Sequence, residues 1–145
     1  MTQRLSVEQY QKLLKTEPRE RKQRNNEEHQ HQAAFFAILK NNEFRYPFLE
    51  FIFAVPNAAK RNKQTAGILI AEGLKAGVPD VVIPMARRGF HGAYIENKAG
   101  KNTLTASQIK YRDFLISETY YFKSCYSVDE QISTLEWYLG IDLRK

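Results

Sequence analysis

The sequence predicts an α/β fold in which helices flank a central mixed β-sheet. Apolar and aromatic runs of strand length alternate along the chain with segments whose apolar residues recur at helical spacing. The chain has 145 residues, of which 43% are hydrophobic and 12% aromatic, enough for one well-filled core but not for two full domains. No segment repeats another. Such an alternation favours one sheet covered by helices.

The start of the chain predicts a short helix followed by a basic linker. Residues Leu5 to Lys15 carry apolar side chains at loosely helical spacing. Residues 16–26 contain Pro18 and several Lys and Arg, with almost nothing apolar. We therefore expect residues 1–26 to form an N-terminal helix and basic arm, and residues 27–145 to form the folded domain.

Two helices and a strand are expected next. A stripe that includes Ala33 and Phe36 predicts a helix from Glu27 to Lys40. The aromatic and β-branched run from Phe48 to Val55, bounded by prolines, predicts a strand. Residues Asn62 to Leu74 return to helical character, and the glycines that follow are plausible stop signals.

The second half predicts a hairpin, a helix, a strand and a last helix. Asp80–Pro84 and Gly92–Lys98 are short apolar runs joined by a polar turn with glycine, which is typical of a β-hairpin. Capping-box patterns at Thr105 and Ser127 predict helices ending at Ser117 and Gly140, respectively. The aromatic run between these helices, 121–126, predicts a strand.

Two carboxylates and a lysine stand at the open end of the predicted hairpin, away from its turn. Asp80 opens the first strand, and Glu96 and Lys98 close the second. Because side chains alternate along a strand, Glu96 and Lys98 project from one face while Ala93 and Ile95 point to the other. Carboxylate oxygens suit a hard cation such as Mg²⁺, and a nearby ammonium can hold a phosphate or a hydroxide. This grouping predicts phosphodiester hydrolysis.

The composition narrows the partners. A net charge of +6 and a pI near 9.4 favour a polyanionic partner, with nucleic acid as the first candidate. The single cysteine, Cys125, lies in an apolar run and is expected to fill a strand position. His29 and His31 point to different helix faces, which disfavours a zinc site. Without a long apolar run, neither secretion nor membrane insertion is indicated, so we expect a cytoplasmic protein.

Four short motifs occur in a fixed order between residues 27 and 140. They are Glu28 to Gln32, Val55 to Asn57, Gly73 to Asp80, and Glu96 to Lys98 followed by Gln108. This combination resembles the VRR-NUC nucleases of the PD-(D/E)xK superfamily, whose small stand-alone members are common in phages and bacteria. The resemblance implies a restriction-endonuclease-like core and a Mg²⁺- or Mn²⁺-dependent DNA nuclease.

The resemblance also implies a metal-ligand set. Asp80 and Glu96 would hold the metal, with the backbone carbonyl of Asn97 as a further ligand. Glu28 would add a carboxylate from the first core helix, although Glu27 is a close rival. The usual apolar residue between Glu and Lys is Asn97 here, and it is expected to point away from the metal face.

Two further roles in catalysis follow from the resemblance. Lys98 would orient or activate the attacking water and steady the phosphate. Gln108 would contact the site from the following helix, or it could serve only as the capping partner of Thr105. Asp80 as a turn residue and Glu96 with Lys98 as a solvated strand face are the structural alternatives.

Basic and polar residues after the first strand and in the hairpin turn are expected to meet phosphates flanking the cut. They are Asn57, Lys60, Arg61, Lys63, Arg87 and Arg88. The family's glycines after the Pro-Asn step are Ala58 and Ala59 here, which leaves the path of that loop open.

Substrate and assembly are open at the level of sequence. Stand-alone members of this fold often work as homodimers, which would suit a two-fold symmetric branched DNA such as a Holliday junction. RNA is an open alternative substrate. The chain could instead be a non-catalytic nucleic-acid-binding module, or a subunit of a phage DNA-processing assembly. A bacterial cell or a phage-infected host is the expected setting.

Overall fold

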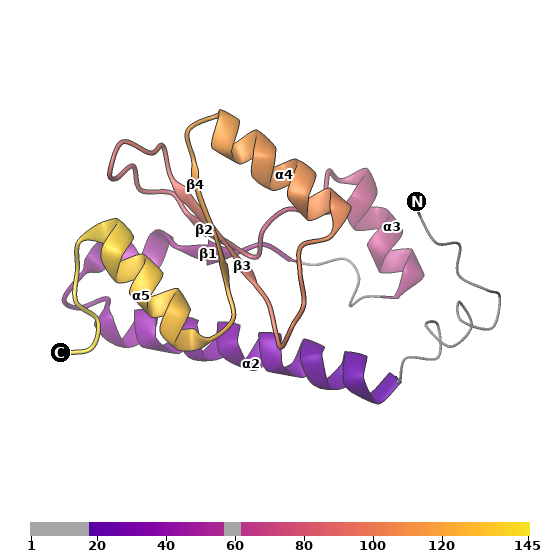
Figure 1. Ribbon diagram of the computed structural model, residues 1–145, viewed down its shortest axis with the longest axis horizontal. Coiled ribbons are helices and arrows are strands. Elements are labelled where there is room, and N and C mark those ends of the chain that lie inside the picture. The colour runs from indigo at the N-terminus through magenta and orange to yellow at the C-terminus, as the bar shows by residue number, and fades with distance from the viewer. Residues whose placement is uncertain (1–17, 57–61) are drawn as a thin grey trace, which may run out of the picture.

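A computed structural model describes residues 18–56 and 62–145, and it shows an α/β fold (Figure 1). Its helices are α2 (Pro18–Asn42), the 3-10 helix η1 (Pro47–Phe51), α3 (Lys63–Ala71), α4 (Ala106–Ser117) and α5 (Val128–Leu139). Its strands are β1 (Phe53–Ala54), β2 (Val81–Ile83), β3 (Ala93–Asn97) and β4 (Tyr121–Cys125). Across these residues, no helix combines the length and apolar character that a membrane span requires.

The four described strands form one mixed sheet in the order β1-β2-β3-β4. Strands β2 and β3 are the predicted hairpin, with Val81 opposite Ile95 and Ile83 opposite Ala93. Strand β1 pairs antiparallel with β2, whereas β4 pairs parallel with β3 after the crossover through α4. The hairpin therefore occupies the middle of the sheet, and the ends of its strands are flanked on both sides.

Helices cover both faces of this sheet. Helices α2 and α5 lie against one face and α4 lies against the other (Figure 1). Ala93 and Ile95 are buried, as the alternation in β3 predicts. They join a core built from both hairpin strands, α2 and α5, whose fully buried members include Phe35, Leu39, Val81, Leu135 and Tyr138. Alternate residues of β3 therefore face α4.

Helix caps fix several boundaries. Asn62 caps α3 by accepting a hydrogen bond from the Thr65 amide, which confirms a helix in this segment. Thr105 and Gln108 form the predicted capping box at the start of α4. Ser127 caps α5, but the Glu130 carboxylate accepts from the Tyr126 amide, so the second predicted box is one-sided.

The prediction of a strand from Phe48 to Val55 is wrong over most of its length. Pro47 begins the 3-10 helix η1, because its ring presets the backbone angle of a first helical position. Leu49 and Ile52 are buried three residues apart, a helical spacing rather than the alternation of a strand. Only Phe53 and Ala54 belong to β1.

The first core helix starts earlier than expected. Helix α2 begins at Pro18, so residues 18–26 are helical and not a linker. This segment is rich in Arg, Lys, Gln and Glu, which are good helix formers even without an apolar stripe, and proline is tolerated in a first turn. Residues 1–17, with the helix expected from Leu5 to Lys15, lie outside the described residues. The division of the chain at residue 26 stays a prediction.

Candidate active site

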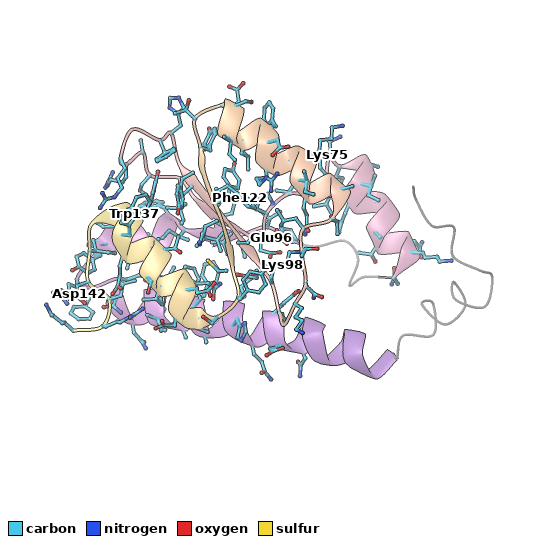
Figure 2. All side chains as sticks on the ribbon, in the orientation of Figure 1. Lys75, Glu96, Lys98, Phe122, Trp137 and Asp142 are labelled. Carbon is cyan, nitrogen blue, oxygen red and sulfur yellow. The ribbon has the colours of Figure 1, made fainter. Side chains whose placement is uncertain are left out.

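The hairpin and α4 bring the predicted acidic residues and lysine to one end of the sheet. Asp80 directly precedes β2, Glu96 lies in β3 and Lys98 directly follows β3. The Asn97 amide donates a hydrogen bond to Asp80 Oδ2 at 2.8 Å, which ties the Asp80 carboxylate to the neighbouring strand. Glu96 and Lys98 lie next to each other near the middle of the molecule (Figure 2).

A buried hydrogen-bond network joins Glu96, Lys98 and Gln108. Lys98 Nζ donates to Gln108 Oε1 at 2.8 Å and lies 3.3 Å from Glu96 Oε1. Gln108 Nε2 donates to the same Glu96 oxygen. Glu96 and Lys98 are only 3% and 6% exposed, so the alternative of a solvated strand face is wrong. Gln108 Oε1 also accepts from the Thr105 amide, and the capping role therefore coexists with the contact to Lys98.

The environment of Glu96 disfavours a bare negative charge. Burial, followed by the nearby charge of Asp80, raises the pKa of Glu96 from 4.5 to about 8. The Lys98 ammonium opposes this rise in the Glu96 pKa but does not cancel it, and Glu28 adds a small further increase. Glu28 is half-buried on α2, whereas its rival Glu27 is exposed. Of this pair, it is Glu28 whose charge affects the Glu96 pKa.

The donor set fits a hard divalent cation. Glu96 Oε2 is buried and has no hydrogen-bond partner among the described residues. Within residues 18–56 and 62–145, no group of three or more His, Cys, Asp and Glu side chains is arranged to hold a metal. Mg²⁺ typically uses only one or two carboxylates and keeps several waters. Asp80 and Glu96 match that requirement.

Asn97 points to the opposite face of β3, as predicted. Its side chain donates to Gln32 Oε1 of α2 at 2.8 Å and accepts from Gln131 Nε2 of α5 at 2.6 Å. Sequence reasoning missed Gln131. The signal was a polar residue on the apolar stripe of α5, between Val128 and Ile132. This amide network holds both covering helices to the strand that carries Glu96 and Lys98.

A tight turn places Asp80 beside α4. Gly77 has a φ of +83°, and a Cβ there would collide with the backbone carbonyl of Ser107. The loop before β2 can therefore pack directly on the first turn of α4 only because residue 77 is glycine. This close approach brings the loop that leads to Asp80 against the helix that carries Gln108.

The predicted DNA-contacting residues do not all lie at this end of the sheet. Lys63 is exposed at the start of α3. Arg87 and Arg88 lie in the hairpin turn, which joins the opposite ends of β2 and β3 from the acidic cluster. Arg88 donates from Nε to the Trp137 carbonyl at 2.6 Å, and its guanidinium lies 4.5 Å from the Trp137 ring. Asn57, Lys60 and Arg61 lie outside the described residues.

Comparison with known proteins identifies one class of similar structure. No family model and no curated protein matches the chain. A solved structure described as a VRR_NUC domain protein is 29% identical in sequence, with a TM-score of 0.54 over 64% of this chain and 70% of that one. This match confirms the predicted resemblance to the VRR-NUC family and the α/β fold with a restriction-endonuclease-like core.

Proposed function

We propose that this chain, which resembles a VRR_NUC domain protein in sequence and fold, is a metal-dependent DNA endonuclease that hydrolyses phosphodiester bonds. The observation that carries the proposal is the hydrogen bonding of the two Glu96 carboxylate oxygens. One of its buried oxygens is bound by Gln108 and Lys98, whereas the other has no hydrogen-bond partner among the described residues and can accept a cation. A second carboxylate, Asp80, stands close enough to raise its pKa.

Mg²⁺ or Mn²⁺ would be held by Asp80 and Glu96, with the Asn97 carbonyl as a further ligand and Glu28 adding a carboxylate directly or through water. Bound there, the cation would polarise the scissile phosphate, lower the pKa of a coordinated water and stabilise charge on the leaving oxygen.

The protein's own groups orient the reactants. Lys98 is held by Gln108 Oε1 and Glu96 Oε1, so its ammonium has little freedom to leave the cluster. With its proton kept at Nζ, Lys98 would donate to the attacking water or to a non-bridging phosphate oxygen. Gln108 would hold both Lys98 and Glu96 in place from α4. The oxygen of the attacking water would bond to phosphorus as the bond from phosphorus to the leaving oxygen breaks. The electron pair of that bond would stay on the leaving oxygen, and the proton released by the water would pass to solvent.

DNA is the proposed substrate, and the net charge of +6 supports a polyanionic partner. Branched DNA such as a Holliday junction, a homodimer and a cytoplasmic setting in a bacterial or phage-infected cell belong to the same proposal. Their support is the resemblance stated above.

The test is cleavage of a supercoiled plasmid and of labelled linear, flapped and four-way-junction DNAs with Mg²⁺, Mn²⁺ or EDTA. Asp80→Asn and Lys98→Ala should each lower the cutting rate by roughly 100-fold or more, since each removes a group that acts on developing charge. Lys123→Ala, an exposed lysine of β4, is the matched control and should cut like the wild type. DNA binding without cutting under every metal condition would instead support a non-catalytic binding module.

A further inference from the structure

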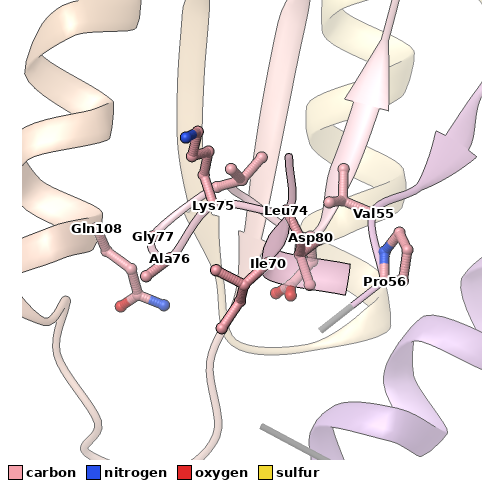
Figure 3. A pocket seen from close by; sticks show the side chains of 10 residues that line it. Val55, Pro56, Ile70, Leu74, Lys75, Ala76, Gly77, Asp80 and Gln108 are labelled. Atoms are coloured by element: carbon pink, nitrogen blue, oxygen red, sulfur yellow. The ribbon is translucent and has the colours of Figure 1, made fainter. Parts of the chain in front are cut away.

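A pocket of about 300 Å³ opens beside Asp80 and Gln108 (Figure 3). Gln108 lies on one side of it, Val55 and Pro56 lie on the other, and Ile70 projects between them. This volume is at the lower end of the range of roughly 300–1,000 Å³ that small-molecule sites occupy. The pocket has room for a group of nucleotide size but not for a duplex.

The lining of this pocket combines apolar and polar residues. Val55, Pro56, Ile70 and Leu74 contribute apolar side chains, and Lys75, Asp80 and Gln108 are its polar members. Helix α3 has no residue that the described part of the chain fully buries. Ile70 is 59% exposed there, so its side chain contributes little to the core and is free to contact a ligand.

We propose that this pocket binds one unstacked nucleobase of the DNA strand being cut, next to a scissile phosphate at Asp80. This inference rests on the proposed nuclease function. A nucleobase has a flat apolar face that fits against Ile70 and Leu74, while Lys75 meets a neighbouring phosphate. A base inside a duplex must be unstacked at a free-energy cost of about a few kcal/mol, which an unpaired base largely avoids.

The pocket also predicts that base identity matters little. Gln108 is the amide side chain of the pocket, and both ends of its amide are already bound by Lys98, Thr105 and Glu96. The apolar side chains of Val55, Pro56, Ile70 and Leu74 cannot read hydrogen-bonding edges. The enzyme should therefore prefer DNA with an unpaired base at the cut, without strong sequence preference.

The experiment uses a flapped DNA with 2-aminopurine as the first unpaired base, together with a fully paired duplex of the same sequence. We would measure 2-aminopurine emission during titration with protein in Ca²⁺, and the flap-over-duplex ratio of kcat/KM in Mg²⁺. Ile70→Asn should weaken binding of the flapped DNA, and lower the cleavage ratio, by roughly tenfold each. Ile68→Asn is the matched control, because Ile68 is 54% exposed on the same helix but does not line the pocket.

Equal effects of Ile70→Asn and Ile68→Asn, or unchanged 2-aminopurine emission when the wild type binds, would overturn the inference. If both DNAs are cut and Ile70→Asn leaves the flap-over-duplex ratio of kcat/KM unchanged, the nucleobase pocket is overturned while the proposed nuclease function is retained. Binding that depends on Ile70, with no cutting in Mg²⁺ or Mn²⁺, would support the nucleobase pocket and overturn the proposed nuclease function.

Discussion

At the residue scale, Glu96 and Lys98 differ from an ordinary surface ion pair. Their charged atoms lie 3.3 Å apart, yet burial still raises the pKa of Glu96 to about 8. Removing two charges from water costs more than their mutual attraction returns unless further partners complete the site. Burial therefore favours the protonated form of Glu96 in the folded protein, and a divalent cation bound to Glu96 would compete with that proton.

The raised pKa of Glu96 predicts how the free energy of unfolding depends on pH. Between pH 4.5 and about 8, the folded protein binds a proton at Glu96 that the unfolded chain has released. The free energy of unfolding should therefore fall as the pH rises through this window, by up to about 1.4 kcal/mol per pH unit from this one group. Glu96→Gln, which keeps the shape without the ionisation, should flatten that dependence.

Urea unfolding at pH 5, 6.5 and 8 in EDTA measures this dependence for both proteins. The difference between wild type and Glu96→Gln is the quantity of interest, because it isolates the titration of Glu96 and its interaction with the neighbouring charges. An equal slope in the two proteins would mean that Glu96 ionises normally in the fold.

At the element scale, the loop before β2 depends on close packing against α4. Gly73 and Gly77 both have positive φ angles, of +104° and +83°. A Cβ at Gly73 meets nothing within 4 Å among the described residues, whereas a Cβ at Gly77 collides with the Ser107 carbonyl. Gly73→Ala should therefore show only the backbone cost, on the order of 1–2 kcal/mol.

Gly77→Ala should lower the free energy of unfolding by more than Gly73→Ala and should also lower the rate of DNA cutting, because the loop must move away from α4 and take Asp80 with it. Urea denaturation and cleavage of a plasmid in Mg²⁺ measure the two effects. If the two glycine variants lost the same stability and the same activity, the contact with Ser107 would not be what places Asp80.

The amide network behind the site makes a second prediction for the elements. Asn97→Leu removes the centre of the network, so that Gln131 Nε2 and Gln32 Oε1 lose the partner that Asn97 supplies. We expect a loss of about 1–3 kcal/mol, the usual penalty for a buried unsatisfied polar group. Adding Gln131→Leu should restore part of that stability, because it removes the unpaired amide. A double-mutant cycle by urea unfolding measures the coupling, and purely additive losses would contradict it.

Local sequence signals predicted some elements better than others. The hairpin and the start of α4 were predicted because strand alternation and a capping box act over a few residues. The strand expected from Phe48 to Val55 failed because an aromatic run fits a 3-10 turn as well as a strand, and Pro47 decides in favour of the turn. The early start of α2 was missed because helix propensity without an apolar stripe gives no periodic signal.

At the scale of the whole molecule, the candidate site was predictable because its residues are joined by local pairing. Asp80 and Glu96 come together through the register of one hairpin, and Gln108 is brought in by the helix that follows. The position of Arg87 and Arg88 could not be read in the same way. Arg87 and Arg88 share the hairpin with the acidic cluster. However, the turn joins one end of the two hairpin strands, and the acidic cluster lies at the other end.

That separation governs how the protein should meet DNA. At about 3.3 Å per residue, the hairpin turn lies roughly 16 Å or more from the acidic cluster. Arg88 already donates to the Trp137 carbonyl and lies on the Trp137 ring, whereas Lys63 is exposed at the start of α3. Lys63 starts α3, the helix that also supplies Ile70 to the pocket beside Asp80. Electrostatic contact near the cut should therefore depend more on Lys63 than on Arg88.

The measurement is the slope of log Kd against log salt for a labelled DNA bound in Ca²⁺. Each phosphate contact to duplex DNA contributes about 0.9 to that slope. Lys63→Ala should reduce the slope by close to one contact and weaken binding at low salt, while Arg88→Ala should leave the slope unchanged. A reduced slope in Arg88→Ala would show instead that bound DNA runs the length of the hairpin, about five base pairs beyond the cut at roughly 3.4 Å each.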